Sequence, residues 1–374
     1  MKVLLKASSL LLALLIVCAA FTGCHAKNET AITIGEIKIK SSTYSCALTQ
    51  AYQEAVSKVE EQESDSSEHN HTDGYMKEKI DKKSFGDWVK DRAKEICKEY
   101  AAVYTLAKTE KITLSDDELS QISQTASYYW TSYGLEDLYG NLGVSQDTYE
   151  GFLGYSSLKE KVFTTLYGEN GSKAVDTNEV TNTIYTEHNT AEVLQKNFSD
   201  STDQSSDDIK SQYQAYVDRI NAGESFKTIY CEANNTTEEE LDEQMASYSS
   251  SDSEQPANRL EQVIGAEGTD YESELFDTVK GLEVGKATLY SNDTYCAVVV
   301  KTDITKDEYY KTALNSSALR YLKGDEFDEL IKDTYKALDF KESKYATSRF
   351  KVKDVNKQYL EVQKKNASQQ TTNQ

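Results

Sequence analysis

Few side chains in this 374-residue sequence have the types and spacing that catalysis or metal binding requires. His69-Asn70-His71 stands between Glu68 and Asp73, and two imidazoles with a carboxylate are sound zinc ligands. The sequence offers no fixed third ligand there, so we interpret this segment as a solvated loop and predict no metal or other cofactor. Asp116-Asp117-Glu118 are adjacent carboxylates, but at an expected helix start they are capping residues. A glycine-rich phosphate loop, a Ser-His-Asp set and a CxxC pair are all missing from the sequence.

Cys24 is the side chain with the clearest expected modification. It ends the run Phe21-Thr22-Gly23-Cys24, behind two lysines and an apolar stretch over residues 10–20. This is the layout of a bacterial secretion signal, and the apolar stretch is shorter than the roughly 20 residues of a membrane span. The cut site resembles a lipobox, with Phe21 where leucine is usual, which implies a lipid on the Cys24 thiol. An ordinary signal peptide cut near Ala19-Ala20, or an uncleaved anchor, is the alternative.

The composition limits the possible partners. The chain has 63 acidic and 41 basic residues, a formal net charge of −22, so we exclude nucleic-acid binding, which needs clustered positive charge. On the same ground we exclude a charge-driven contact with anionic lipid, which leaves Cys24 as the membrane attachment. A single proline, Pro256, favours long helices. Four cysteines follow Cys24, and the sequence leaves open whether they are disulfides or thiols: Cys46, Cys97, Cys231 and Cys296.

The elements that would position such residues are mostly helices in the first half of the chain. Isoleucines alternate over residues 31–40 around Gly35, which predicts two short strands. Apolar residues at helical spacing predict helices over residues 43–61, 84–108, 116–133, 144–167 and 176–187. Ser115 and Glu118 have the spacing of a capping box at the start of the third helix.

The pattern changes near residue 189. We predict a strand over residues 191–199, a helix over 207–222, a helical turn over 224–229 and a helix over 271–279. Residues 234–267 are polar and are interpreted as an insertion or a loosely held loop. Residues 286–290 and 295–302 predict a hairpin, residues 306–338 a helix, and the polar residues at the end of the chain a disordered tail.

This order resembles that of the SurA- and PrsA-type extracytoplasmic foldases, whose helical part is related to trigger factor, over most of the chain after the signal. Residues 32–39 resemble the V-N-G-x-x-I opening of that family, and residues 112–119 its gI-x-v-s-d-x-E helix start. Leu142-Gly143-Val144-Ser145 and Asp176-Thr177-Asn178-Glu179-Val180 resemble the next two joints.

Residues 189–304 resemble a parvulin, the peptidyl-prolyl isomerase domain of this family. Ala222-Gly223-Glu224-Ser225-Phe226 resembles its x-G-x-x-F turn, Phe276 begins a stretch like f-x-x-a-x-x-L-k-x-G, and residues 295–301 resemble the closing G-y-H-i-i-k-v strand. The resemblance implies an α+β fold with a signal peptide over 1–23, a helical chaperone module over 24–188 and a degenerate parvulin-like domain over 189–304. A C-terminal helix over 305–352 would complete the helical module, with a disordered tail over 353–374.

The parvulin resemblance also implies two catalytic histidines on neighbouring strands beside an apolar proline pocket. The first strand, Ala191-Glu192-Val193-Leu194, has no histidine, and Cys296 stands at the second position. Cys296 and Phe276 are therefore the candidate catalytic residues. Desolvation and distortion of the amide can still lower the isomerisation barrier, so the prediction is weak or absent isomerase activity. His188 would replace the missing histidine only in a shifted register; we favour a loop histidine.

An aromatic run supplies the candidate client-binding residues, Tyr128, Tyr129, Trp130 and Tyr133. Neighbours on a helix point about 100° apart, so at least one ring is expected at the surface, where it can capture apolar segments of unfolded chains. We predict a lipid-anchored, ATP-independent foldase on the extracytoplasmic face of a bacterial membrane, with unfolded or partly folded secreted proteins as partners. The alternatives are an active isomerase with substituted catalytic groups and a structural or adaptor lipoprotein. The oligomeric state stays open.

Overall fold

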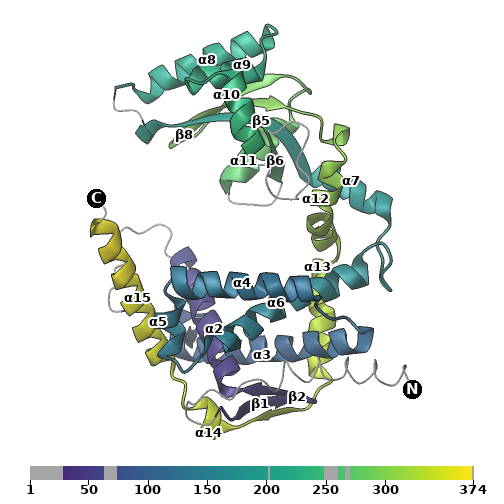
Figure 1. The fold of residues 1–374 in the computed structure, drawn as a ribbon, viewed down its shortest axis with the longest axis vertical. Coiled ribbons are helices and arrows are strands. Elements are labelled where there is room, and N and C mark those ends of the chain that lie inside the picture. The colour runs from purple at the N-terminus through teal and green to yellow at the C-terminus, as the bar shows by residue number, and fades with distance from the viewer. Residues whose placement is uncertain (1–27, 63–73, 201–202, 248–259, 266–269, 373–374) are drawn as a thin grey trace. The chain divides into compact units, whose positions relative to one another are not determined.

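The computed structural model describes residues 28–62, 74–200, 203–247, 260–265 and 270–372. Cys24 and the His69-Asn70-His71 run lie outside these residues. The chain divides into two compact units (Figure 1), which we call the helical unit (residues 1–166 and 325–374) and the inserted unit (167–324). Helices combine with small antiparallel sheets in both units, which confirms the α+β class. The inserted unit extends beyond the segment 189–304 on both sides, because α7 (Thr177–Glu187) and α12 (Tyr309–Ala313) pack within it.

Two long helices form the centre of the helical unit. Helix α2 (Ser41–Gln62) packs along α3 (Phe85–Glu110), and alanines on the buried faces of both let the helices approach closely. A short hairpin of β3 (Lys79–Ile80) and β4 (Lys83–Ser84) precedes α3. The other helices of this unit are α4 (Asp116–Ser132), α5 (Leu135–Gly140), α6 (Gln146–Tyr167), the second half of α13 (Asn315–Lys336), α14 (Lys344–Thr347) and α15 (Val352–Thr372).

A three-stranded sheet joins the two ends of the chain. The predicted strands are β1 (Thr30–Ile34) and β2 (Ile37–Lys40), and β9 (Phe340–Glu342) adds to the other edge of β1. Gly35 makes the turn between β1 and β2 with a φ of +57°, and a Cβ there would lie 3.0 Å from Leu338 Cδ2. Glycine is therefore the residue that this turn accepts without strain.

Helix α4 begins at the capping box that the sequence predicts. The Ser115 side chain accepts from the Glu118 N–H, and the Glu118 carboxylate accepts from the Ser115 N–H. Lys161 of α6 also binds this carboxylate, at 2.5 Å. The Lys161 ammonium and the Ser115 N–H together hold the pKa of Glu118 at about 2. This carboxylate is therefore ionised at neutral pH and links α4 to α6.

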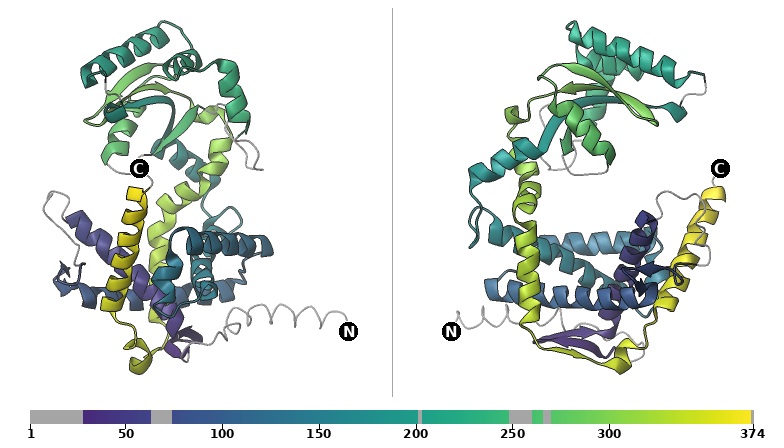
Figure 2. Two further views of the ribbon diagram at one scale, coloured as in Figure 1. Left: turned by 60° about the vertical axis from the view of Figure 1, so that its left-hand side comes forward. Right: turned by 180° about the vertical axis from the view of Figure 1, so that it is seen from behind.

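Residues 353–372, expected as a disordered tail, instead form most of α15. Val352 and Val355 are buried, and the ring of Tyr359 lies 5.2 Å from that of Tyr52 on α2. These residues recur at helical spacing, so they form one narrow apolar stripe in an otherwise polar segment. Figures 1 and 2 show α15 lying along the helical unit, where it packs on α2 and α5. Burial of this stripe is the reason the polar tail is ordered.

Asn356 is the buried polar residue of this contact. Its Oδ1 accepts from the Tyr52 hydroxyl at 2.8 Å and from the Tyr75 N–H at 3.2 Å. Gly74 passes so close that a Cβ on it would lie 2.3 Å from Asn356 Oδ1, and its φ is +83°. The side chain thus ties α15 to α2 and to the segment that leads into β3.

The inserted unit has a four-stranded antiparallel sheet in the order β6-β5-β8-β7. The predicted hairpin, β7 (Ala287–Ser291) with β8 (Tyr295–Lys301), is confirmed, and β5 (His188–Asn197) pairs with β8 on its other side. The polar segment 234–267 contains two elements that the sequence did not indicate, α10 (Glu238–Ser247) and the edge strand β6 (Glu261–Gly265). The remaining helices are α8 (Ser206–Asn221), α9 (Phe226–Ala233) and α11 (Asp270–Lys280).

Candidate functional site

The sheet of the inserted unit is apolar on both faces, and each face is covered by different helices (Figure 1). Side chains of α8 and α9 cover the face that carries Leu194, Cys296 and Val298. Phe276 and Val279 of α11 cover the opposite face. Successive side chains of a strand point to opposite faces, so the alternation along β8 fixes which helix each residue meets.

Cys296 lies at the α8 face and is completely buried. Burial raises the pKa of its thiol, so the sulfur is a neutral thiol at physiological pH. Its strand neighbours are Lys196 on β5 and Ser291 on β7. The environment of Cys296 is that of a core residue.

Phe276 lies on the other side of the sheet. It is a residue of α11 and is buried in the same cluster as Val299 and Ala297 of β8. The Lys280 ammonium lies 5.2 Å from the centre of its ring. The two candidate catalytic residues are therefore on opposite faces, and the sheet itself separates them. One substrate amide cannot contact both side chains in this arrangement.

His188 is the one histidine among the residues that the structure describes. It is the first residue of β5, with Nδ1 3.3 Å from the Ile184 carbonyl at the end of α7. Its partner across the sheet is Gly265 on β6, whereas Cys296 pairs with Lys196, eight residues further along β5. At about 3.4 Å per residue this is about 27 Å, so a shifted register does not bring His188 to Cys296.

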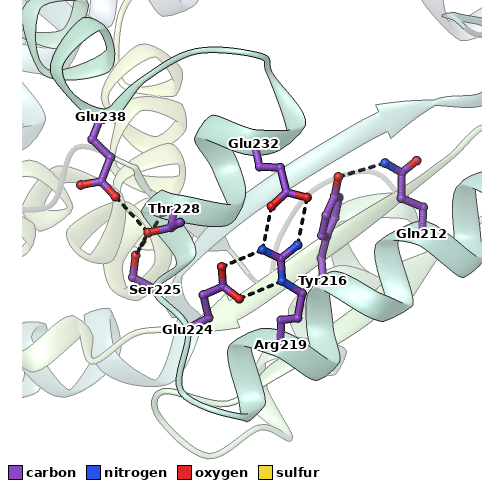
Figure 3. Close-up of polar contacts among 8 residues, drawn as sticks. All are labelled: Gln212, Tyr216, Arg219, Glu224, Ser225, Thr228, Glu232 and Glu238. Atoms are coloured by element: carbon purple, nitrogen blue, oxygen red, sulfur yellow. Dashed lines mark hydrogen bonds and ion pairs between the residues drawn. The ribbon is translucent and has the colours of Figure 1, made fainter.

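The x-G-x-x-F turn is held by an ion-pair network (Figure 3). The Arg219 guanidinium donates to both oxygens of Glu224, at 2.8 and 2.7 Å, and to both oxygens of Glu232, at 2.9 and 2.7 Å. Gly223 sits in this turn with a φ of +108°, and Phe226 is buried beyond it. These ion pairs of Arg219 thus connect α8 to the turn and to α9, and their role is structural.

Three of the four candidate client-binding residues form a cluster at the surface of the helical unit, which we call the tyrosine cluster: Tyr128, Tyr129 and Tyr133. Their exposed fractions are 56%, 37% and 56%, and their ring centres lie 5.4 to 5.9 Å apart. A hydrogen bond with Tyr133 raises the pKa of Tyr128, which keeps that phenol neutral. The cluster presents neutral aromatic surface to solvent.

Trp130 does not belong to this cluster. It is 8% exposed and its ring stacks on Tyr139 at 6.4 Å, inside the helical core. Helix α4 turns its side chain away from its neighbours Tyr128 and Tyr129, as a 100° step per residue requires. Direct contact between Trp130 and a client is therefore a prediction that the structure corrects.

A second surface feature was not indicated by the sequence. An open groove of about 570 Å³ on the helical unit is lined by Trp88 of α3, Phe340 of β9 and charged side chains. Phe340 is 39% exposed, and the Lys98 ammonium lies 5.7 Å from its ring centre. In the sequence, Trp88 is one of the residues at helical spacing that predict the helix over residues 84–108.

Two solved foldase structures are similar to this chain. The foldase PrsA of Streptococcus pneumoniae is 14% identical, with a TM-score of 0.37, and the match covers 65% of this chain and 82% of PrsA. PrsA of Bacillus subtilis is 15% identical, with a TM-score of 0.32, and covers 72% of this chain and 94% of its own. PrsA is also the type of foldase that the sequence motifs resemble. These identities and TM-scores are too low to transfer residue roles from PrsA.

In sequence, the chain matches no family model and no curated protein. Among the described residues, no helix has both the length and the apolar character that crossing a bilayer requires.

Proposed function

We propose that this protein is an extracytoplasmic, ATP-independent foldase whose helical unit binds unfolded segments of secreted proteins. The observation that carries the proposal is the tyrosine cluster on α4 and at its C-terminal end. A tyrosine ring offers an apolar body and a polar edge, so it can contact many different sequences without a fixed pocket. The aromatic rings pack on one another, which keeps the surface in place while no client is bound.

The described residues of the inserted unit do not bring the candidate catalytic groups together. Its sheet is apolar on both faces, and its candidate catalytic groups are a neutral thiol and a phenylalanine on opposite faces. His188, the one histidine in the described part of the sheet, lies eight residues along β5 from Lys196, the partner of Cys296, which is about 27 Å. We therefore retain weak or absent isomerase activity as part of the proposal.

The first prediction concerns client binding. Replacing Tyr128 and Tyr133 by serine is expected to raise the concentration needed to suppress aggregation of an unfolded test protein by about thirtyfold, because each exposed anchor is worth about 1 kcal/mol. Light scattering during dilution of the denatured test protein measures it. The matched control replaces Tyr321 and Tyr345, which are 53% and 69% exposed. If both double variants lose the same amount of aggregation suppression, the tyrosine cluster is not the client-binding surface.

The second prediction concerns isomerase activity. The complete mature chain is expected to accelerate prolyl-peptide isomerisation less than about twofold over the spontaneous rate, which takes tens of seconds. Cys296→Ala is expected to leave this rate unchanged, as is Cys231→Ala, a control at another buried cysteine of the same unit. A large acceleration that Cys296→Ala abolishes and Cys231→Ala preserves would show that the cysteine is catalytic.

The third prediction concerns the membrane. We propose that Cys24 carries the lipid, on the layout of the signal sequence. Cys24→Ala is expected to move the protein from the membrane fraction to the soluble fraction or to block its processing, whereas Cys18→Ala keeps it on the membrane. Fractionation followed by analysis of the mature N-terminus measures both. A native N-terminus at any residue other than Cys24 contradicts the assignment.

A further inference from the structure

One end of the helical unit carries positive charge, although the chain as a whole is acidic. Between residues 340 and 357 the sequence has six cationic residues and two acidic ones, against 41 and 63 in the whole chain. Two lysines of β2 lie beside this segment. We call the exposed surface of Lys38, Lys40, Lys341, Lys344 and Tyr345 the basic face; Arg349, Lys351 and Lys353, which are also exposed, follow it in sequence.

The sheet β2-β1-β9 aligns the first of these cations. Lys38 and Lys341 are the partners of Thr33 on its two sides, so the three residues form one row across the sheet. Ile32 and Ile34, at the alternate positions of β1, are completely buried. The period of two in a strand therefore points the lysines away from the core, into solvent.

Helix α14 continues this surface. It follows β9 directly, and the Ser343 N–H donates to the Ala31 carbonyl of β1 at 2.8 Å, which places α14 beside the sheet. Lys344 and Tyr345 are its first two residues, and Tyr345 is 69% exposed. A highly exposed tyrosine among cations is the arrangement found where proteins meet membrane headgroups.

The acidic side chains in the region neutralise the basic face only in part; besides the Lys94 and Thr347 side chains, Lys344 helps to lower the pKa of Glu342. Glu342 points to the other side and binds Lys94 at 2.9 Å, and Glu36 binds Lys108 at 2.7 Å. Glu29, Asp339 and Asp354 border the face. Within the described residues the lysines of this face form no ion pair, in contrast to lysines elsewhere on the unit: Lys83, Lys94, Lys98, Lys108 and Lys161.

The start of the described chain is fixed at this same end. Asn28 Oδ1 accepts from the Ser42 N–H at 3.2 Å and from the Ser42 hydroxyl at 3.1 Å, next to Lys40. Asn28 is four residues after Cys24 in the sequence, and four fully extended steps span at most about 14 Å. A lipid on Cys24 would therefore tether the protein to the bilayer at this end.

We propose that the basic face docks on anionic phospholipid headgroups of the membrane in which the lipid is anchored. This contact goes beyond the proposed chaperone function and does not depend on it. Basic residues close to an anionic membrane each increase binding about fivefold, within a screening distance of about 8 Å. The net charge of −22 argues against such a contact for the chain as a whole, but the exposed charged residues of this face are cations, with Glu29, Asp339 and Asp354 at its border.

The test uses the complete mature chain with Cys24→Ala, so that no lipid contributes. Flotation is measured with vesicles of phosphatidylcholine containing about 30% phosphatidylglycerol, and with phosphatidylcholine alone. We expect binding to the anionic vesicles only, falling about tenfold or more between about 0.05 M and 0.3 M salt. The variant Lys38→Glu/Lys341→Glu/Lys344→Glu is expected to lose binding by tenfold or more.

The matched control is Lys58→Glu/Lys286→Glu/Lys306→Glu, which changes the net charge equally at exposed lysines outside the face and is expected to bind within about twofold of the parent. Tyr345→Ser should weaken vesicle binding and leave binding to a soluble polyphosphate unchanged. Equal binding to neutral and anionic vesicles, an equal loss in the control, or tighter binding to the polyphosphate than to vesicles would overturn the proposal. None of these outcomes affects the aggregation assay, so the two proposals fail separately.

Discussion

Replacing Phe327 by alanine is expected to lower the free energy of unfolding of the helical unit by about 3–5 kcal/mol. Phe327 of α13 is completely buried, and its ring meets that of Phe163 on α6 edge to face at 5.2 Å. Truncation removes the buried ring and leaves a cavity that the two helices cannot fill. Urea unfolding followed by tryptophan fluorescence measures the effect, since Trp88 and Trp130 are the only tryptophans and both lie in this unit.

Phe340→Ala is the control for this prediction. It removes the same atoms from a side chain of the same unit that is 39% exposed, and its expected cost is about 1 kcal/mol or less. If both truncations cost the same, the packing of α13 on α6 is not what stabilises the unit.

Replacing Asn356 by alanine is expected to cost about 2–4 kcal/mol, measured in the same way. The change leaves the Tyr52 hydroxyl and the Tyr75 N–H without their acceptor in a buried site, and each orphaned donor costs about 1–3 kcal/mol. The control is Asn141→Ala. It removes an exposed amide that donates to Gln358 of α15, the helix that also carries Asn356, and it should lower the free energy of unfolding by less than about 0.5 kcal/mol.

A double-mutant cycle tests whether the cost of Asn356→Ala arises from its hydrogen bond to Tyr52. Tyr52→Phe removes one of the two donors, so the cost of Asn356→Ala should be about 1 kcal/mol smaller in that background. Additive costs in the cycle would mean that the Asn356 effect does not arise from its bond to Tyr52.

Much of the fold could be predicted where the signal is local. Ser115 and Glu118 cap α4 through bonds within one helical turn, and the isoleucines around Gly35 specify a hairpin of two strands. The β7–β8 hairpin has the same character. In each case the residues that determine the structure are a few positions apart, so the sequence contains the complete pattern.

The elements that were not predicted depend on distant partners. β9 is three residues long and exists because β1, some 300 residues earlier, offers an open edge. Helix α15 is polar in composition and is ordered by Val352, Val355 and Asn356, which meet α2. β6 is an edge strand that pairs only with β5. None of these partners can be identified from the segment itself.

The candidate site was predictable only in part, for a related reason. Alternation along β8 places Cys296 and Ala297 on opposite faces, but the sequence does not say which face α11 covers. Phe276 could therefore not be assigned to the face opposite Cys296. On α4, the 100° step predicts that the aromatic run must divide, and the structure decides that Trp130 is the buried member.

The position of β1 between β2 and β9 has a consequence for the order in which the protein matures. A chain that is synthesised or exported from its N-terminus presents β1 and β2 long before residues 340–342 arrive. The inserted unit is contiguous and has its own core, so it can fold during this interval. The helical unit stays incomplete, with one edge of β1 unpaired, until the last part of the chain follows. The proposed client-binding unit is thus the last part of the protein to be completed.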